Sequence, residues 1–367
     1  MSARRVVFAG GGTAGHVQPA LAVAKKWRES HPEDSIIFLG TSSGLENTLV
    51  PQAGFELAHI TRVRVPRSLT PSLLKVPTQL RAAISESKQI LKDADLLIGF
   101  GGYVCAPAYL AAHSLKIPIV IHEANAKPGW ANRLGARYTS ALAVGTPVSS
   151  GLFAGALITG LPLREDIAQL LIANESSDSS QWSALRRDAR LKFELDANKK
   201  TILVFGGSQG SAAINSVIAA ARVGLSERGF AIIHSAGGLN ELPVSDNSYK
   251  AFAYIDEMAA AYLAADLIIA RSGAITCSEV GALGKFALFI PLPVGNGEQA
   301  VNAHELVSAG RAMTVQQEAF TSAWLLDNID SMLAKSALQG DGVESRDLAA
   351  AAKIVALMEH QLENSMK

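Results

Sequence analysis

Short apolar runs that end in glycine turns and continue into helical stretches constrain the fold of this chain most strongly. The first run, RVVFA at residues 5–9, leads into the turn Gly10–Gly15, which has the spacing GxGxxG, and then into an alanine-rich stretch. A parallel strand covered by helices on both faces is apolar along its whole length, so such runs predict strands of a parallel sheet. The sequence therefore predicts α/β architecture.

Nine runs of this kind fall into two groups. Those in the first 160 residues are RVVFAG, SIIFLG, DLLIGF, IPIVIHE and ALAVG, and those after residue 200 are TILVFGG, FAIIHSAG, DLIIARSG and FALFIPLP. The halves also repeat each other, because ADLLIGFGGYVCAPAYLAA aligns with ADLIIARSGAITCSEVGAL, each downstream of a similar strand, glycine turn and helix. Two matches in the same order predict paired Rossmann-like domains that face each other across a cleft.

The domain boundary is expected near Gly160-Leu161-Pro162. We predict a first domain over 1–161, a second over 162–345, and a tail helix over 346–367 whose apolar side needs another surface to cover it. The polar stretch 174–181 is predicted to be a surface loop. A chain of 367 residues is long enough for two cores.

Charge and composition exclude several classes of protein. The formal net charge is zero, which argues against a nucleic-acid-binding protein with a broad basic surface. A glycine turn and Lys25-Lys26 interrupt the apolar N-terminus, and the uncharged stretch 141–163 contains several glycines and prolines, so we expect neither a signal peptide nor a spanning helix. Cys105 and Cys277 are predicted to be buried thiols in a cytoplasmic protein.

The GxGxxG turn alone does not establish a dinucleotide site, since any tight turn from strand to helix favours glycine. An NAD or FAD site also needs an acidic residue at the end of the second strand, to hold the ribose. Here that strand ends in Gly40-Thr41-Ser42-Ser43, and Glu46 follows later. We therefore predict no dinucleotide cofactor.

Four glycine turns follow predicted strands, at Gly10–Gly15, Gly99–Gly102, Gly206–Gly210 and Arg271–Gly273. Turns at the carboxyl ends of strands leave backbone N–H groups at helix N-termini free to bind anions. Four turns exceed what one phosphate needs. They predict a ligand that carries a nucleoside diphosphate.

The fourth turn, RSGAITCSE, carries the most chemistry. Ser272 and Gly273 open a helix with the Thr276 hydroxyl in its first turn and Glu279 about one turn later, which suits a phosphate and a sugar diol. An N-cap followed by a favourable acid near the positive helix end is the open alternative. The Asp93–Asp95 pair precedes its strand and so lies at the amino edge of the sheet, and no metal is predicted.

These motifs closely resemble the MurG family of bacterial glycosyltransferases (glycosyltransferase family 28). The match extends over almost the whole chain and comprises GGTAGHVQPALA, GFGGYVCAPA, HEANAKPG, GLPLRED, GGSQGSAAIN, YIDEMAAAYLAADLIIARSGAITCSE and GEQAVNA. The resemblance implies a GT-B fold and metal-free, inverting transfer of N-acetylglucosamine from UDP-N-acetylglucosamine. The implied acceptor is the C4 hydroxyl of the undecaprenyl-pyrophosphoryl N-acetylmuramyl pentapeptide, in peptidoglycan synthesis at the cytoplasmic membrane face, with the cell-wall and division machinery as partners.

The resemblance also assigns donor contacts in both halves. They are Thr13, Ala14, Gly15 and Asn125 for the sugar and diphosphate, Arg164 and Ser208 for the diphosphate, Ile255 for uracil through backbone groups, Ala274, Ile275, Thr276, Cys277, Ser278 and Glu279 for the nucleotide and sugar, and Gln299 and Asn302 for the sugar hydroxyls. One departure is Ala14, where the family more often has glycine. Its methyl group fits the turn only if its φ is negative.

A general base must accept the proton of the acceptor hydroxyl. His16 follows the first glycine turn and Glu123 ends a predicted strand, so both are candidates. The pKa of histidine lies near neutral pH, which favours His16 slightly. A purely structural role for such a histidine is the alternative.

The lipid acceptor implies a membrane-binding surface, and the segment 62–84 mixes apolar and basic residues. They are Leu69, Leu73, Leu74, Val76 and Leu80 with Arg62, Arg64, Arg67, Lys75 and Arg81. This pattern suits anionic headgroups, although a surface helix with basic residues extended over apolar neighbours has the same pattern.

Three other functions fit parts of the pattern. A UDP-N-acetylglucosamine 2-epimerase would release an altered sugar without an acceptor, another lipid glycosyltransferase would use a different acceptor, and a binding module would bind nucleotide without turnover.

Overall fold

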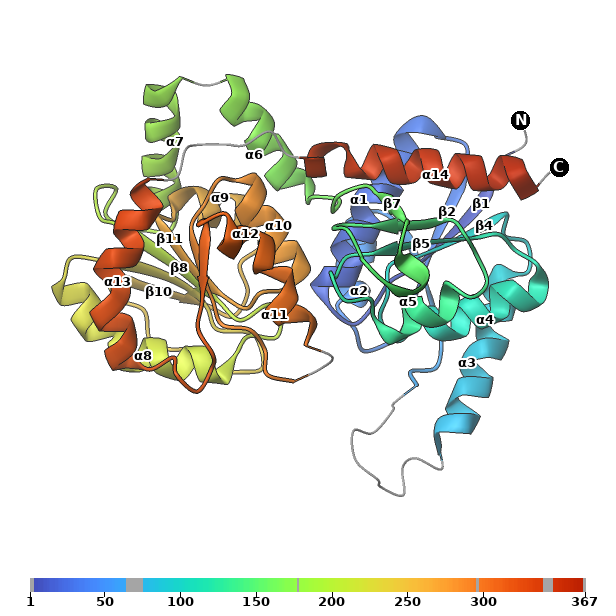
Figure 1. Cartoon of the computed structure of the whole chain (residues 1–367), viewed down its shortest axis with the longest axis horizontal. Helices are drawn as coiled ribbons and strands as arrows, with labels where there is room; N and C mark the ends of the chain where they lie inside the picture. Colours follow the sequence, from blue (N-terminus) through green and yellow to red (C-terminus); the bar gives the residue numbers. More distant parts are fainter. Residues whose placement is uncertain (1–2, 64–74, 177, 295–296, 339–345, 366–367) are drawn as a thin grey trace. The chain divides into compact units, whose positions relative to one another are not determined.

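The computed structural model describes residues 3–63, 75–176, 178–294, 297–338 and 346–365. The chain forms two compact units. The first unit comprises Met1–Arg164 and Arg346–Lys367, and the second comprises Glu165–Ser345. Each unit is built on one parallel sheet (Figure 1).

The first unit contains a seven-stranded sheet in the order β3-β2-β1-β4-β5-β6-β7. Its strands are β1 (Arg5–Ala9), β2 (Ser35–Gly40), β3 (Glu56–His59), β4 (Leu96–Gly99), β5 (Ile119–Glu123), β6 (Leu142–Val144) and β7 (Leu157–Ile158). Every neighbouring pair is parallel. Branched and aromatic side chains fill both faces of the inner strands, as the apolar runs predict.

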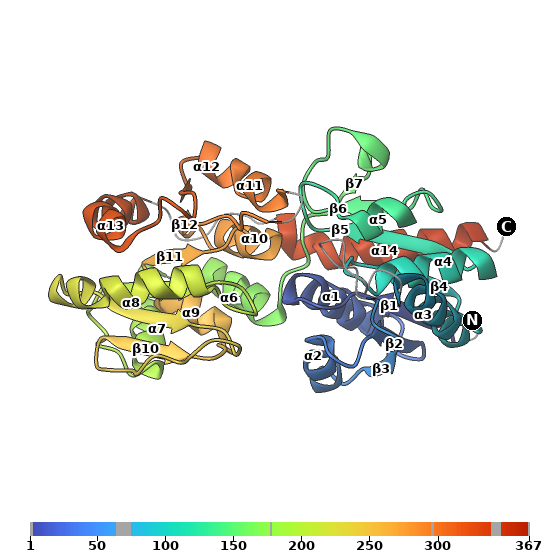
Figure 2. The same cartoon turned by 90° about the horizontal axis from the view of Figure 1, so that it is seen from below.

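Helices cover both faces of this sheet. They are α1 (Ala14–Ser30), α2 (Glu46–Gln52), α3 (Val76–Leu91), α4 (Cys105–Leu115), α5 (Trp130–Gly135) and α14 (Ala350–Ser365), with short 3₁₀ turns η2 (Gly151–Phe153) and η3 (Arg346–Ala349). On one face, α14 packs beside α1, and its Ile354, Met358 and Leu362 join the core. On the other face, α3, α4 and α5 lie side by side (Figure 2).

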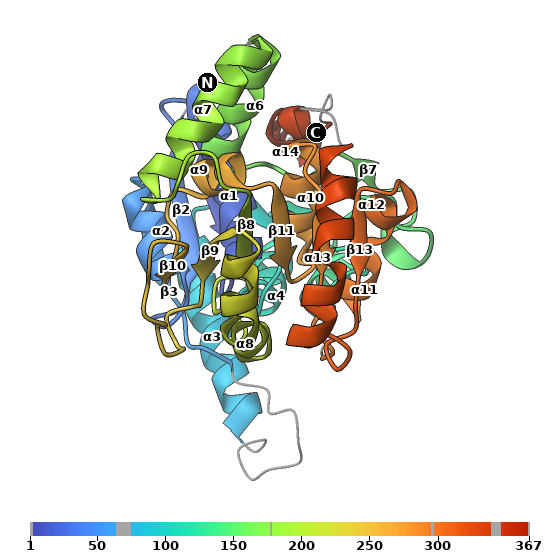
Figure 3. The same cartoon turned by 90° about the vertical axis from the view of Figure 1, so that its left-hand side faces the viewer.

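The second unit contains a six-stranded parallel sheet in the order β10-β9-β8-β11-β12-β13. Its strands are β8 (Thr201–Phe205), β9 (Ala231–Ser235), β10 (Tyr249–Phe252), β11 (Leu267–Ala270), β12 (Ala287–Phe289) and β13 (Ala312–Thr314). Its helices are α6 (Glu165–Ser176), α7 (Ser179–Lys192), α8 (Ala212–Glu227), α9 (Met258–Ala264), α10 (Ala274–Ala282), α11 (Glu298–Asn302), α12 (His304–Ser308) and α13 (Ser322–Ala337). Helices α8 and α13 pack together over the core (Figure 3).

When the strands of each unit are numbered from its first strand, both sheets contain the order 3-2-1-4-5-6, and the first sheet adds β7 at its edge. This is the Rossmann order. The predicted pair of Rossmann-like α/β domains is confirmed. The internal repeat extends to single hydrogen bonds. Asp95 accepts the amide N–H of Arg5 at 2.7 Å in the first unit, and Asp266 accepts that of Thr201 at 2.8 Å in the second.

The tail forms η3 and α14 and belongs to the first unit, whose core covers the apolar side of α14. The predicted loop at 174–181 is wrong, because α6 continues to Ser176 and α7 begins at Ser179. Asp178 caps α7 by accepting the Ser180 and Gln181 amides, while the Gln181 side chain accepts the Asp178 N–H. Such a capping box starts a helix within a stretch whose composition is typical of loops.

The stretch 141–163 forms strands and loops, as predicted, but it is not wholly buried. Leu157 and Ile158 are exposed by about half of their surface because β7 is an edge strand, and Leu152 in η2 is exposed to a similar extent. Within the described part of the chain, no helix is both long and apolar enough to cross a bilayer. Cys105 and Cys277 are free and buried, as predicted, and burial raises the pKa of the Cys105 thiol to about 12.

Candidate functional site

The four glycine turns form two pairs. Strands β1 and β4 are neighbours that end in register at Ala9 and Gly99, and β8 and β11 end in register at Phe205 and Ala270. Each unit therefore brings two turns together at the carboxyl edge of its sheet, next to the central strand where the strand order reverses. Ligands of doubly wound sheets bind at this position.

A carboxylate closes the first turn. Glu46 is fully buried, and its Oε2 accepts the Gly12 N–H at 2.8 Å while its Oε1 accepts the Thr41 N–H at 3.0 Å. The expectation that this turn leaves its N–H groups free for an anion is thus wrong at Gly12. The Glu46 side chain thus reaches the end of β2, where the sequence itself has no acidic residue. Both of its oxygens already accept backbone N–H groups of the protein, so it is not suited to bind a ribose.

His16 lies in the first turn of α1 and contacts the first glycine turn. Its Nδ1 is 3.2 Å from the Gly11 carbonyl oxygen and 3.1 Å from Thr13 Oγ1. A carbonyl only accepts, so the contact with Gly11 places the proton of the neutral imidazole on Nδ1 and the lone pair on Nε2. Burial lowers the pKa of His16, and the charges of Glu123 and Glu46 oppose that shift. The imidazole is therefore neutral near pH 7.

Glu123 ends β5 and is 3% exposed. Its Oε1 accepts the Asn125 backbone N–H at 2.9 Å and side-chain amide at 3.1 Å, and its Oε2 accepts the Gly129 N–H at 2.8 Å and the Asn132 side chain at 3.0 Å. Asn132 in turn accepts the Tyr109 hydroxyl hydrogen at 2.8 Å. This network fixes the loop that carries Asn125. Asn132 and Tyr109 have no spacing signature, which is why the sequence does not predict their role.

Thr13, Ala14 and Gly15 form the start of α1, with Thr13 as the exposed N-cap residue. Ala14 is helical and is not among the residues with positive φ, so its methyl group meets the condition set by the sequence. The departure from the usual glycine is therefore compatible with this turn.

In the second unit, Ser208 lies in the glycine turn after β8, between Gly207 and Gly210, which have φ of 87° and 74°. Both values lie in the region that favours glycine, so this turn requires its glycines. Ser211 then caps α8 by accepting the Ile214 N–H. Ser208 is half-buried and precedes this N-cap residue by three positions.

Helix α10 carries most of the predicted nucleotide contacts. Ala274, Ile275, Thr276 and Ser278 are partly exposed, whereas Cys277 and Glu279 are buried. Glu279 is 4% exposed, and its Oε2 accepts the Tyr262 hydroxyl hydrogen at 2.8 Å. Tyr262, on α9, is thus a neighbour of the site that the sequence does not predict.

Gln299 and Asn302 lie beside the start of α10. The Ser272 hydroxyl donates to the Gln299 carbonyl oxygen at 2.8 Å, and the Asn302 side-chain amide donates to the Ser272 carbonyl at 3.2 Å. The Gln299 side-chain oxygen accepts the Leu292 N–H at 3.0 Å, so its amide nitrogen is the group that can donate to a ligand. The structure therefore brings these two residues together with α10.

The remaining predicted residues lie at separate positions. Ile255 is 4% exposed in the connection between β10 and α9. Arg164 is half-buried at the last position of the first unit's main segment. Within the described residues, no group of three His, Cys, Asp or Glu side chains could hold a metal ion. Asp95 lies at the amino edge of the sheet, as predicted, because it accepts the N–H of the first residue of β1.

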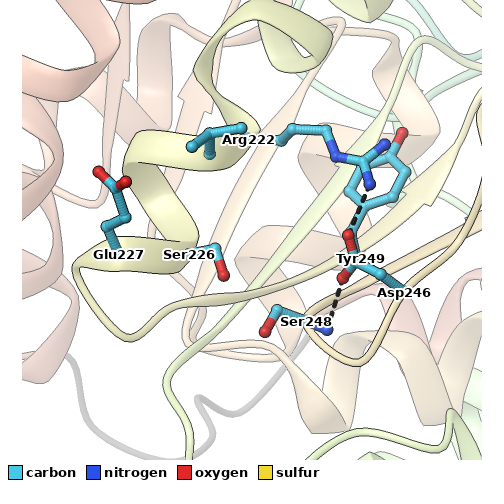
Figure 4. A pocket seen from close by; sticks show the side chains of 7 residues that line it. Arg222, Ser226, Glu227, Asp246, Ser248 and Tyr249 are labelled. Carbon is cyan, nitrogen blue, oxygen red and sulfur yellow. Dashed lines mark hydrogen bonds and ion pairs between the residues drawn. The ribbon is translucent and has the colours of Figure 1, made fainter.

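A pocket on the second unit lies between the end of α8 and the segment that leads into β10 (Figure 4). Its lining residues are Arg222, Val223, Ser226, Glu227, Asp246, Ser248 and Tyr249. Tyr249 begins β10 and Glu227 ends α8, which places the pocket at the amino edge of the sheet. Arg222 is paired with Asp246 there, and no predicted site residue lines the pocket.

Comparisons with known proteins agree with this geometry. The glycosyltransferase family 28 N-terminal domain matches residues 6–144, and the corresponding C-terminal domain matches residues 201–357. A UDP-N-acetylglucosamine–N-acetylmuramyl-(pentapeptide) pyrophosphoryl-undecaprenol N-acetylglucosamine transferase from Streptomyces avermitilis is 45% identical over 90% of this chain and 89% of its own length.

Two solved structures illustrate the range of the likeness. The crystal structure of MurG from Acinetobacter baumannii is 29% identical, with a TM-score of 0.67 over 97% of this chain and 99% of its own. A UDP-GlcNAc 2-epimerase from Neisseria meningitidis is 16% identical, with a TM-score of 0.58 over 97% and 100% of the two chains. At that identity the epimerase shares the fold alone.

Proposed function

The chain belongs to glycosyltransferase family 28, and on that premise we propose that its two sheet edges divide one transfer reaction between them. It is a glycosyltransferase that moves N-acetylglucosamine from UDP-N-acetylglucosamine to the C4 hydroxyl of the undecaprenyl-pyrophosphoryl N-acetylmuramyl pentapeptide, a step of peptidoglycan synthesis. The identity to relatives with this activity favours it over the epimerase and the binding module.

The donor is assigned to the second unit. The supporting observation is the cluster in which Ser272 bonds to Gln299 and Asn302 at the start of α10. In this proposal the α8 and α10 N-termini and Arg164 face the diphosphate, and the Ile255 backbone binds uracil. Glu279 binds the ribose and the Gln299 amide binds the sugar hydroxyls.

The acceptor chemistry is assigned to the first unit. The acceptor oxygen attacks the anomeric carbon, the bond to UDP breaks with inversion, and the acceptor proton goes to His16 Nε2. The departing diphosphate gains negative charge, which helix N-termini and Arg164 stabilise. The imidazolium that forms is stabilised by the buried charges of Glu123 and Glu46, which act on His16 through space.

His16 is a better base than Glu123. The Glu123 carboxylate already accepts four hydrogen bonds, and protonating it would break some of them. We therefore assign Glu123 a positioning role for the loop that carries Asn125, while Thr13, Ala14 and Gly15 line the approach to the sugar and diphosphate. His16 has the lone pair and the neutral state that a base requires.

We assign membrane contact to the segment that leads into α3. Its described basic residues Arg62, Lys75 and Arg81 are exposed, with Val76 and Leu80 partly buried beside them. Arg64, Arg67, Leu69, Leu73 and Leu74 lie outside the described residues. In this proposal the protein is peripheral at the cytoplasmic face of the membrane, where the lipid acceptor lies, and works with the cell-wall and division machinery.

One experiment tests the reaction directly. The protein is incubated with radiolabelled UDP-N-acetylglucosamine, UDP-N-acetylgalactosamine or UDP-glucose and the lipid-linked muramyl acceptor, with and without EDTA. We expect label in the lipid only from UDP-N-acetylglucosamine, with EDTA having no effect. An altered UDP-sugar formed without acceptor would support the epimerase, and activity lost in EDTA and restored by Mg²⁺ would refute the metal-free mechanism.

A further inference from the structure

Arg271 is a buried cation at the carboxyl edge of the second sheet. It follows the last residue of β11, begins the turn that opens α10, and is 7% exposed. It is not among the residues assigned to the donor, the acceptor or the base. A buried guanidinium is costly unless its charge is balanced.

The guanidinium joins three other segments of this edge. Its Nη1 donates to the carbonyl oxygens of Ile290 and Pro291, just beyond β12, at 3.0 and 3.1 Å. Its Nη2 donates to the N-cap hydroxyl of Ser211 on α8 at 2.8 Å and to Gln317 Oε1 at 2.6 Å. Arg271 therefore fixes the starts of both helices that are assigned to the diphosphate.

None of these four acceptors carries a charge. Glu318 acts on Arg271 through space, but it is exposed, so water screens its charge. Burial lowers the pKa of Arg271, although arginine stays protonated at neutral pH. The guanidinium thus has no carboxylate among its hydrogen-bond partners, and it lies beside the partial positive charges of two helix N-termini.

We infer that Arg271 is a positioning residue for the diphosphate of the donor, holding the α8 and α10 turns in place while its unbalanced charge favours the anionic leaving group. The ligand itself brings the balancing charge. This inference rests on the proposed donor, UDP-N-acetylglucosamine, and places Arg271 outside the set of residues that touch it.

Gln317→Glu tests the inference without removing Arg271. The substitution keeps a hydrogen-bond acceptor at the same position and adds a carboxylate that pairs with the guanidinium. We expect UDP affinity, measured by calorimetry, to fall about tenfold while uridine affinity stays unchanged. The thermal midpoint should be equal or higher, since a buried ion pair replaces an unbalanced charge.

The matched control is Gln316→Glu, which adds the same charge at the adjacent exposed residue and should leave UDP affinity unchanged. Arg271→Lys keeps the charge and should retain more of the preference for UDP over uridine than Arg271→Met. Unchanged UDP affinity in Gln317→Glu, or an equal loss of UDP and uridine affinity, would overturn the inference. Failure of the unaltered chain to bind UDP would instead refute the proposed donor.

Discussion

At the carboxyl edge of its sheet, the first unit buries two carboxylates, Glu46 and Glu123, whereas the second unit buries the guanidinium of Arg271. The carboxylates accept backbone N–H groups at Gly12 and Gly129, and the guanidinium donates to the carbonyls of Ile290 and Pro291. The same strand order thus supports two buried carboxylates at one edge and a buried guanidinium with a single buried carboxylate, Glu279, at the other.

This difference shows what a repeated fold determines and what it leaves to side chains. The strand order fixes where two glycine turns meet, because neighbouring parallel strands end at the same edge. The buried charges decide which chemistry the edge favours. In the proposed reaction, the two carboxylates of the first edge favour an imidazolium at His16, and Arg271 at the second edge favours the departing diphosphate. Glu279 also lies at the second edge, where it accepts the neutral Tyr262 hydroxyl.

The largest effect is expected at His16. The difference between the two edges predicts that its replacement lowers turnover without weakening the binding of UDP. His16→Ala should lower kcat by at least about 10²-fold, since a general base contributes about 10²–10⁴-fold. UDP affinity should change little, because UDP is assigned to the second unit. Steady-state kinetics and calorimetry on the same preparation measure both quantities.

Glu123→Gln is the companion variant and should lower kcat comparably or less. The amide keeps an acceptor for part of the network around Asn125, but it loses the charge that favours the His16 imidazolium. If His16→Ala retains near-normal kcat while Glu123→Gln loses it, the carboxylate is the base. If both variants retain kcat, neither residue accepts the proton.

The sequence predicts the inner strands and misses the edges. Within the described residues, all nine inner strands of the two sheets coincide with predicted apolar runs, whereas the four edge strands β3, β7, β10 and β13 were not predicted. Inner strands are covered on both faces and are apolar throughout. Edge strands such as Glu56–His59 are short and partly exposed, so they have no continuous apolar run.

The site shows the same division. Residues attached to a glycine turn, such as His16, Ser208 and Thr276, could be placed at the edges from sequence because the turn fixes their position. Arg271 lies in one of those turns, but its hydrogen bonds to Gln317 and Ile290 join segments distant in sequence, and no local pattern indicates them. The sequence therefore does not predict polar contacts between residues that are distant in the chain.

A second prediction compares buried histidines, one in each unit. Burial lowers the pKa of both His122 on β5 and His234 on β9 to about 4. The unfolded chain binds protons below about pH 6.5 and the folded chain only near pH 4, so stability is full above pH 6.5 and falls as the pH drops to 4. Each histidine should cost roughly 3 kcal/mol of unfolding free energy at pH 4.

The first unit should open first in acid. Protonated His234 has acceptors at both nitrogens, Tyr249 Oη at 2.6 Å and Asn215 Oδ1 at 3.0 Å. His122 has the Gly160 carbonyl at Nε2, and its buried Nδ1 has no partner. Hydrogen exchange at pH 5 should show earlier loss of protection in β5 than in β9. His122→Gln should flatten this pH dependence, unlike the exposed control His113→Gln; equal behaviour of the two variants would contradict it.

The third prediction concerns the second edge alone. Glu279→Ala should weaken UDP binding by roughly 1.5–3 kcal/mol, the value of a hydrogen bond to a charged group. Tyr262→Phe is the matched variant, because it removes the hydroxyl that now occupies one carboxylate oxygen and should leave UDP affinity equal or higher. Unchanged UDP affinity in Glu279→Ala, with an intact fold by circular dichroism, would make Glu279 a purely structural acid near a helix N-terminus.

The smallest effect per residue is expected at the membrane, where basic helices of the two units can be compared. In the second unit, α7 uses Arg186 and Arg190 to bind Asp266, and Lys192 pairs with Glu257. In the first unit, Lys75 and Arg81 at the start of α3 are exposed and have no ion pair among the described residues. On α7 only Arg187 is exposed without an ion pair among the described residues, whereas the start of α3 presents two such charges to anionic headgroups, so α3 rather than α7 should bind the membrane.

Lys75→Ser with Arg81→Ser should therefore weaken binding to phosphatidylglycerol vesicles by about 1 kcal/mol per residue. Activity on a water-soluble acceptor analogue should be retained, because neither residue is among those assigned to the donor or to the transfer of the acceptor proton. The matched control is Arg187→Ser with Lys192→Ser on α7, which removes two basic residues from the second unit and should leave vesicle binding unchanged. Vesicle sedimentation measures both pairs, with uncharged phosphatidylcholine vesicles as the baseline. Equal losses in the two pairs would mean that net charge alone drives binding, and a loss only in the α7 pair would place the membrane contact on the second unit.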